Sequence, residues 1–420
     1  MTPKFRRLSR AAAFVAVAFG FPHSCPAATI TLPDAIQRAL RNAPSIEAAN
    51  AAGDMTRAQT REARAALYPS VAAGAEYYQA PGYSEVITNR GLSAAMLTLD
   101  YTAWDWGRRA ARVRAAEYVG EAAQFGVAAA RAQIVFDTTV AYFDLDRARD
   151  TERELGSSLV RLTTYAATIE ALRKSGRAQA SDVLKARSSR DTVELSIAAA
   201  RGDRDTAASA LGSLIGFPSQ AELEIVEISG VPPKPAGDIA QSPVMRAANR
   251  AIECAKMQIQ AAKAERLPTV QLAYTTGFVG VDPPATIGHN FGGSYDTVVS
   301  MPIFDGGAIS ARIDQAMAKQ RAAIAQAHQA EYLLSRRIAG AQTHYDQAIR
   351  QLAVLDRAQA TADDSFALTW TKFLGGGNAT MLEVLDSYEH ADELRIQRFQ
   401  QTFDAREAAA EVNLLYGNTQ

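Results

Sequence analysis

Few residues in this 420-residue sequence have the types and spacing of a catalytic or metal-binding site. The four histidines outside the N-terminal leader do not occur in a metal-ligand spacing such as HExxH; they are His289, His328, His344 and His390. The sequence contains no GxSxG motif and no phosphate-binding glycine loop. Once Cys25 is removed with the leader, Cys254 has no cysteine partner, and we expect it to be a small buried side chain. We therefore predict no enzymatic activity, no metal site and no cofactor.

The acidic pair Glu383 and Asp386 is the strongest candidate for functional charge. The two residues are three apart near the start of a predicted helix, so they share a face, and His390 lies one turn beyond Asp386 on that face. Acidic residues at a helix start also stabilise the helix dipole in solvent. Without further information, this helix-start role is the favoured interpretation of Glu383 and Asp386, ahead of a functional role for their charges.

The elements that position these residues are unusually long. From Tyr295 to Ile303 the odd positions are apolar or threonine and most even positions are polar, which predicts a strand with one apolar face. Asp305 and the two glycines after it end the strand. From Ala308 to about Leu374 there is no proline and one glycine, which predicts a helix of about 67 residues, roughly 100 Å long.

The whole arrangement occurs twice, at an offset of 199 to 201 residues. The matched features are a proline helix start, a proline helix end, a turn after an aromatic-Asp pair, a glycine turn and a glycine end: Pro44 and Pro243, Pro69 and Pro268, Asp105 and Asp305, Gly176 and Gly377, Gly216 and Gly417. A constant offset over the full length predicts one duplicated helix-strand-strand-helix-helix unit.

We predict a signal peptide at residues 1–27, a first repeat at 28–216, a connector at 217–241 and a second repeat at 242–420. The first repeat contains strands at about 70–78 and 92–104 and a helical hairpin at 108–214. The second contains strands at about 269–278 and 293–304 and a hairpin at 308–416. Apolar residues spaced three and four apart, from Leu145 to Ile169 and from Ile338 to Phe366, predict coiled-coil seams within the hairpins.

The N-terminus has the basic start, short apolar run and small residues around Ala27 that are typical of a secretory signal peptide. We expect cleavage after Ala27 or Ala28, with a lipid on Cys25 as the alternative. Cleavage removes four of the 44 basic residues and none of the 45 acidic ones, which leaves a formal charge near −5. With no basic stripe, the sequence gives no indication of nucleic-acid binding.

Four strands with one apolar face each, in an exported chain, suit a membrane β-barrel. Four strands cannot close, and lipid does not tolerate open strand edges, so several chains must share one barrel. Two chains give eight strands and a filled interior, whereas three give twelve and an open pore. The predicted membrane-facing residues are Leu97, Leu99, Tyr101, Val299 and Met301, with Trp104 and Trp106 in an aromatic girdle. The alternative is a periplasmic coiled-coil scaffold or adaptor, in which the strands form a small soluble sheet.

The duplicated unit, the MPIFDGG strand end, the glycine turns followed by SDVLKAR and LEVLDSY, and the Leu-Xaa-Gly ends resemble the TolC-like outer-membrane efflux channel family, the outer membrane factors. The resemblance covers about Thr31 to Gly417. It implies a fold that is mainly α with membrane β: a homotrimer with a twelve-stranded β-barrel in the outer membrane of a Gram-negative cell, continued by a twelve-helix α-barrel across the periplasm.

The same resemblance implies a passive exit duct of a tripartite efflux or type I secretion system. Its partners would be outer-membrane lipid, a periplasmic adaptor (membrane fusion) protein and an inner-membrane pump of the RND or ABC type. Drugs, metal cations and polypeptides all remain open as cargo.

By this resemblance Glu383 and Asp386 form acidic rings at the periplasmic entrance. The tip turns and adaptor contacts are then Gly176, Arg177, Asp182, Gly376, Gly377 and Asn378. We expect Asp182 to pair with a neighbouring helix rather than to line the pore. Some family members hold the tip closed with an arginine or tyrosine in the second turn, where this chain has Leu374 and Ala379.

Overall fold

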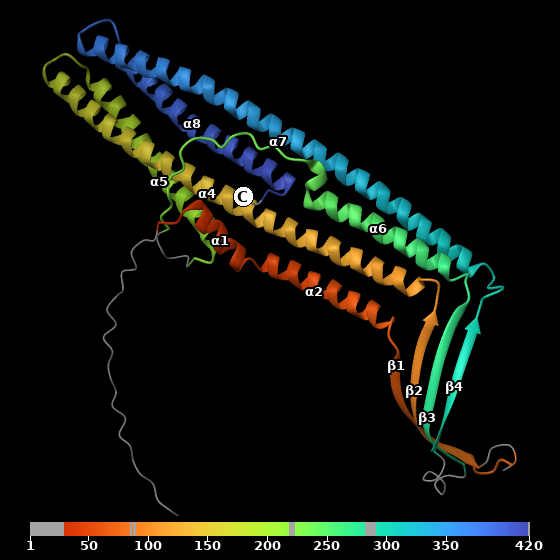
Figure 1. The fold of residues 1–420 in the computed structure, drawn as a ribbon. Coiled ribbons are helices and arrows are strands. Elements are labelled where there is room, and N and C mark those ends of the chain that lie inside the picture. The colour runs from red at the N-terminus through yellow and green to blue at the C-terminus, as the bar shows by residue number, and fades with distance from the viewer. Residues whose placement is uncertain (1–28, 85, 87–89, 218–222, 282–290, 419–420) are drawn as a thin grey trace, which may run out of the picture.

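The computed structural model describes residues 29–84, 86, 90–217, 223–281 and 291–418. A group of long helices lies at one end, and a narrow sheet projects from it at the other (Figure 1). The elements in chain order are α1 (Leu32–Asn42), α2 (Pro44–Ala65), β1 (Ser70–Gln79), β2 (Gly91–Trp104), α4 (Arg108–Lys174), α5 (Ala180–Ile215), η1 (Ile239–Gln241), α6 (Pro243–Ala264), β3 (Thr269–Val281), β4 (Phe291–Ser300), α7 (Ala308–Leu374) and α8 (Met381–Tyr416). The signal peptide predicted at 1–27, with Cys25, lies outside the described residues.

The two longest helices, α4 and α7, each have 67 residues and start in the same way. Asp105 accepts hydrogen bonds from the backbone N–H of Gly107 (3.2 Å) and of Arg109 (2.9 Å), and Asp305 accepts from Gly307 (3.0 Å) and Ile309 (2.6 Å). Each carboxylate therefore satisfies N–H groups that a helix start leaves without a partner. The repeated aspartate-glycine motif is thus a helix-start signal, as the sequence indicates.

Each long helix turns back into a helical hairpin, α4 with α5 and α7 with α8. The predicted seams are buried at most of their positions. The buried members are Leu145, Ala148, Leu155, Leu162 and Ile169 on α4, and Ile338, Ala341, Tyr345, Ala348 and Ala362 on α7. Alanines at these positions allow the helices to approach closely.

The sheet is antiparallel throughout, with the strands in sequence order β1-β2-β3-β4. The first repeat supplies β1 and β2 and the second supplies β3 and β4, so the β2–β3 pairing joins the two repeats. The register shifts between Thr102 and Trp104, so that Trp104 pairs with Val270. This bulge places Trp104 on the same face as Tyr101, whereas simple alternation places it on the opposite face.

One predicted strand boundary is wrong. The strand predicted at 293–304 is β4, which ends at Ser300, so Met301 lies outside the sheet and is not a strand residue. Pairing between β3 and β4 stops at Thr269 with Ser300, because β3 begins at Thr269, directly after Pro268. Pro302 has no N–H to donate, which further disfavours a continued strand.

The connector between the repeats is held to the helices by side chains. Tyr142 of α4 donates its hydroxyl to the carbonyl oxygens of Ile30 (3.0 Å) and Val226 (2.6 Å). Arg149 donates to the carbonyl of Leu223 (2.6 Å). Within the connector, Ile225 forms one isolated bridge with Ile30, and the described connector residues contain no strand.

Candidate functional site

The sheet has one strongly apolar face, which the pairing register defines. Rows of paired residues across the four strands place the following side chains on this apolar face: Val71, Ala73, Leu97, Leu99, Tyr101, Trp104, Val270, Leu272, Tyr274, Phe278, Phe291, Tyr295 and Val299. Of the five predicted membrane-facing residues, Leu97, Leu99, Tyr101 and Val299 lie on it. Tyr295 is 83% exposed and Val299 is 65% exposed in the single chain. A large apolar surface of this kind needs a covering partner or a lipid environment.

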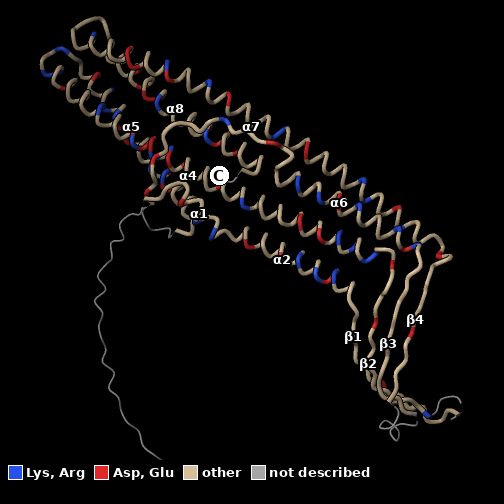
Figure 2. Tube along the Cα trace, in the orientation of Figure 1, with Lys and Arg blue, Asp and Glu red and all other residues tan. Residues whose placement is uncertain are grey.

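The opposite face of the sheet is polar and acidic. The charged residues of the four strands, Glu76, Asp100 and Asp296, are all on this polar face, and the strands contain no lysine or arginine. Asp100 and Asp296 both pair with Ala273, so they occupy one row across β2, β3 and β4. Figure 2 shows acidic but no basic positions along the strands. An amphipathic sheet can separate an apolar from an aqueous environment.

Both outer strands have one unpaired edge in the described chain. β1 pairs with β2 alone, and β4 pairs with β3 alone. The free N–H and C=O groups along such edges are templates for pairing with another chain. Because β1 leaves the helices and β4 returns to them, β4 of one copy would run antiparallel to β1 of the next.

The helical tips at the other end of the molecule repeat one turn geometry. Gly176 and Gly376 have φ of 75° and 72°, in the left-handed region where a glycine avoids strain. The N–H of Arg177 donates to the carbonyl of Leu172 (2.8 Å), and the N–H of Gly377 donates to that of Lys372 (2.9 Å). These are the C-terminal bonds of a Schellman-type helix end, and they explain the glycines that the sequence singles out.

Capping boxes start both return helices. The Thr380 N–H donates to Glu383 (2.7 Å), and the Thr380 hydroxyl accepts from the N–H of Glu383 (3.3 Å). The N–H of Gln179 donates to Asp182 (2.9 Å) in the equivalent box of the first repeat. In this single chain the Asp182 carboxylate binds the start of its own helix, three residues away, and the expected pairing with a neighbouring helix stays a prediction.

The structure separates the roles of the two predicted acidic residues. Glu383 has the helix-start role described above, while Asp386 and His390 are exposed and make no recorded contact in the described part of the chain. All three lie on the outside of α8 in the single chain. Their place relative to other copies depends on assembly.

Arg177 makes a polar contact between the two tips, beside the apolar cluster in which Val183 and Met381 pack. Its guanidinium donates to the carbonyl oxygen of Leu374, at 2.6 Å, and so joins the first turn to the end of α7. Leu374 takes part through its backbone, so its side-chain type gave no signal for this contact. Asn378 lies in the adjacent turn, before the start of α8.

A polar network between α4 and α8 went unpredicted. Its members are Glu154, Ser158 and Arg161 on α4 and Tyr388, Asp392 and Arg395 on α8. Arg161 donates to Asp392 (3.0 Å) and to Tyr388 (3.1 Å), and Ser158 hydrogen-bonds to both of these residues. Both triads have the spacing i, i+4, i+7. Ser158 is buried between Leu155 and Leu162 in the structure, whereas the predicted seam passes through Leu159, so the seam pattern gave no signal for this network.

Burial tunes the ionisable groups of this network. Burial raises the pKa of Tyr388 to about 12, with hydrogen bonds from its neighbours opposing the rise. Burial alone would lower the pKa of Arg161, but its hydrogen bonds to Glu154 and Tyr388 outweigh this effect and raise the pKa. The arginine is charged and the tyrosine neutral at physiological pH, which fixes which group donates.

A second cross-repeat contact is a buried ion pair, Arg406 of α8 with Asp146 of α4, at 2.8 Å. Both side chains are less than 10% exposed. Arg406 also donates to the connector carbonyls of Gly230 (2.9 Å) and Ile228. Burial and the Asp146 charge raise the pKa of the nearby Asp150 to about 6.

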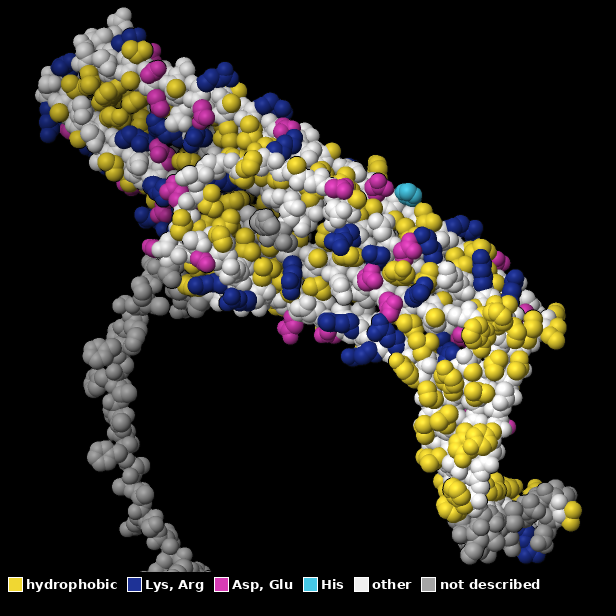
Figure 3. All heavy atoms as spheres, in the orientation of Figure 1, with side chains coloured by type: hydrophobic (Ala, Val, Ile, Leu, Met, Phe, Trp, Pro, Cys, Tyr) yellow, Lys and Arg dark blue, Asp and Glu magenta, His cyan; other side chains and the backbone are white. Residues whose placement is uncertain are grey.

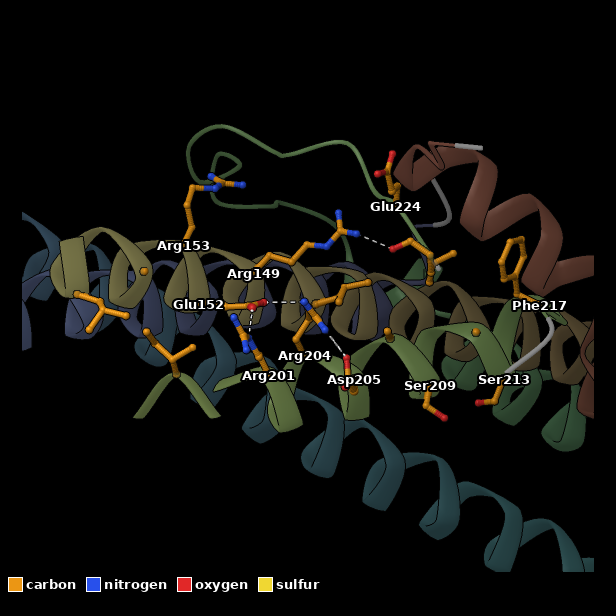
Figure 4. Close-up of a pocket in the computed structure, with 17 residues that line it drawn as sticks. Arg149, Glu152, Arg153, Arg201, Arg204, Asp205, Ser209, Ser213, Phe217 and Glu224 are labelled. Carbon is orange, nitrogen blue, oxygen red and sulfur yellow. Dashed lines mark hydrogen bonds and ion pairs between the residues drawn. The ribbon is translucent and has the colours of Figure 1, made fainter. Parts of the chain in front are cut away.

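A hollow of about 910 Å³ lies between α4, α5 and the connector (Figure 4). Its arginines already have partners. Glu152 accepts from Arg204 (2.8 Å) and Arg201 (3.0 Å), and Arg149 binds the Leu223 carbonyl. These paired charges hold the connector and the helices together.

The described residues contain neither a cluster of metal-binding side chains nor a membrane-spanning helix. No group of three or more His, Cys, Asp or Glu side chains in this part of the chain could hold a metal ion. Among the same residues, no helix is long and apolar enough to cross a bilayer.

Comparisons with known proteins agree on one family. A family model described as outer membrane efflux protein matches residues 35–217 and 238–418, one stretch in each repeat. Outer membrane protein TolC of Escherichia coli (strain K12) is 22% identical over 400 residues, which cover 86% of this chain and 78% of the relative. The outer membrane protein VceC of Vibrio cholerae superposes with a TM-score of 0.81 at 21% identity, covering 93% of this chain and 97% of VceC. The MtrE outer membrane channel of Neisseria gonorrhoeae gives 0.79 at 21% identity, covering 92% and 88%.

Proposed function

Because the chain belongs to the outer membrane efflux protein family, we propose that it is the passive exit duct of a tripartite efflux or type I secretion system. Its named relatives are outer-membrane channels, so its location is the outer membrane. The observation that carries the proposal is the open amphipathic sheet, which is apolar on one face, acidic on the other and unpaired at both edges.

Three copies of the chain would complete the structure. Pairing β4 of each copy with β1 of the next joins like sheets head to tail, and a cyclic arrangement closes them without leaving an edge. Three copies give twelve strands, enough for an open pore, whereas two give eight and a filled interior. The apolar face would then meet lipid and the acidic face would line the lumen. The helical hairpins of three chains would continue the wall as a twelve-helix α-barrel.

A periplasmic scaffold or adaptor role fits this sheet poorly. It would expose Leu97, Tyr295 and Val299 to water, and nothing in the described part of the chain covers them. The cost of exposing apolar area rises with the area, so a sheet of this kind favours a lipid-facing position.

The tips are the proposed docking end. A passive duct needs an energy source elsewhere, which would be an inner-membrane pump of the RND or ABC type reached through a periplasmic adaptor. The adaptor contacts are proposed at the turns, from Gly176 to Asp182 and from Gly376 to Asn378. Glu383 and Asp386 are proposed to form the acidic rings of the entrance, where rings of carboxylates favour cations.

Single-channel recording of the purified protein in a planar lipid bilayer tests the proposal. We expect cation-selective openings that become less selective when Glu383→Gln and Asp386→Asn are combined. Gln at position 383 keeps an acceptor for the capping box, so this pair removes charge without removing the cap. The matched control is Asp203→Asn with Glu393→Gln, which removes two exposed charges from the return helices α5 and α8 away from the tips.

Each outcome is decisive for a different part of the proposal. No insertion by a folded protein would overturn the channel function. Openings with unchanged selectivity would retain the duct and refute the acidic rings. An equal loss of selectivity in the control would assign the effect to overall charge.

A further inference from the structure

We propose that four basic residues at the sheet end of the helices form a binding surface for anionic phospholipid headgroups. We call this surface the basic collar; its residues are Arg61, Arg114, Lys263 and Arg266. The inference rests on the proposed insertion of the sheet into the outer membrane, and it adds a lipid class and its contact residues.

The first part of the collar is a stripe on α2. Arg57, Arg61 and Arg64 are spaced four and three apart, so they share one side of the helix. The stripe lies beside the contact with α4, where the Thr60 hydroxyl donates to the Ala116 carbonyl of α4. Arg57 pairs with Asp54 and Arg64 pairs with Glu117, at 2.5 and 2.6 Å. Arg61 lies between them, exposed and without an ion-pair partner in the described part of the chain.

The other three residues continue this surface across the neighbouring helices. Arg114 lies on α4, four residues before Tyr118 and therefore on the same side of the helix. Arg266 follows the end of α6 and donates to the Ser310 hydroxyl of α7, at 3.0 Å. Lys263 lies in the last turn of α6. All three are exposed, and none has a carboxylate partner among the described residues.

The collar borders the apolar face of the sheet. In Figure 3 basic side chains gather over the helix ends next to the hydrophobic surface of the strands, and both are seen from the same side. Each collar residue lies within about 15 Å of a strand end at 1.5 Å per helical residue. Trp104 and Trp106, which are 57% and 51% exposed, lie at the same junction. Exposed tryptophans of this kind are typical of a membrane interface.

The position of the basic collar at the membrane boundary indicates which ligand it binds. The polar headgroup layer is about 5–8 Å thick on each side of the hydrocarbon core, and long basic side chains reach into it. The strands contain no basic residue, and the four collar residues, which have no carboxylate partner among the described residues, lie just beyond the strand ends. This is the expected depth of the lipid phosphates. Unpaired Arg and Lys groups bind phosphate oxygens, and an added anionic headgroup charge strengthens the attraction. Because the mature chain is net acidic, overall charge would repel such lipids, so local placement must account for the binding.

Native mass spectrometry of the detergent-purified oligomer tests the collar. The probe is phosphatidylglycerol titrated against phosphatidylcholine with the same acyl chains. We expect preferential retention of phosphatidylglycerol by the unmodified protein. In a variant combining Arg61→Gln, Arg114→Gln, Lys263→Gln and Arg266→Gln, this preference should fall by about tenfold or more, since each basic residue near a surface contributes severalfold.

The matched control removes the same charge far from the sheet. Arg38, Arg131, Arg336 and Arg350 are exposed and without an ion-pair partner in the described chain, and Gln at all four should keep the preference. Equal losses in both variants, or no loss in the collar variant, would overturn the proposal. Bilayer conductance of the collar variant keeps the two proposals separate, because normal channels without lipid preference would refute the collar alone.

Discussion

The guanidinium of Arg177 and the carbonyl oxygen of Leu374 are 2.6 Å apart, so a single hydrogen bond joins the turn of the first hairpin to the end of α7 in the second. The two hairpins also meet beside the turns in an apolar cluster that includes Ile169 and Val183 of the first hairpin and Met381 and Val384 of the second. The Arg177 hydrogen bond adds to this apolar contact and holds the second turn in place.

Removing this bond should loosen the second tip. In Arg177→Ala we expect amide hydrogen exchange at residues 372–380 to rise by about fivefold to tenfold, which corresponds to the loss of one hydrogen bond of about 1 kcal/mol. The control is Arg173→Ala, which removes an arginine that pairs with Glu170 in its own helix. Unchanged exchange in Arg177→Ala would show that the tips are held elsewhere.

The network between α4 and α8 should respond asymmetrically to substitution. Asp392→Ala leaves Arg161 without a carboxylate it contacts at 3.0 Å, and we expect a loss of about 3 kcal/mol in thermal or denaturant stability. Tyr388→Phe removes a hydroxyl alone and should cost about 1–2 kcal/mol. The exposed Glu393→Gln should change stability little. Equal effects of Asp392→Ala and Glu393→Gln would contradict the network's importance.

The raised pKa of Asp150 predicts a specific pH dependence. Its pKa in the folded state is about 6, above the ordinary value of 3.8, so the folded chain binds the proton more tightly than the unfolded chain. Its contribution to stability is therefore fully present below about pH 3.8 and is lost as pH rises through about 6. Asp150→Asn should raise the melting temperature at pH 7 and flatten its change between pH 4 and 6. A parallel curve for the two proteins would contradict the assignment.

The capping boxes predict a difference between two substitutions at one residue. Glu383→Gln keeps an acceptor for the Thr380 N–H and should preserve stability, while Glu383→Ala loses the box and should cost about 1 kcal/mol. Thermal unfolding of both variants measures the difference. If the two are equally destabilised, the carboxylate charge rather than the cap stabilises the start of α8.

The sequence predicted the elements well because each carries a local signal. The starts of α4 and α7 follow from an aspartate and a glycine, and their ends follow from the glycine turns. The predicted end of β4 was four residues too late. The alternating pattern continues from Val299 to Ile303, but β3 has no residue left to pair beyond Thr269. The apolar and polar alternation of one strand does not show where the strand that pairs with it begins or ends.

The contacts at the tips and between repeats were harder to predict, for a physical reason. Arg177 binds a backbone carbonyl, and a backbone carbonyl has the same chemistry at every residue. Arg161 and Asp392 are 231 residues apart, and their partnership depends on the helix packing rather than on spacing. Asp182 differs from these residues, because its carboxylate accepts from the N–H of Gln179, three residues away in the chain.

The central seam of the sheet, β2 against β3, has a consequence for biogenesis. Its paired residues lie between 166 and 189 positions apart in the chain, from Trp104 with Val270 to Leu92 with Val281. A chain that emerges from the inner membrane N-terminus first presents the β1–β2 hairpin long before β3 is available. During that interval an apolar hairpin with an open edge is exposed to proteases and to other chains. Long-range pairing of this kind is slow, so this protein should depend on periplasmic chaperones until the second repeat has arrived.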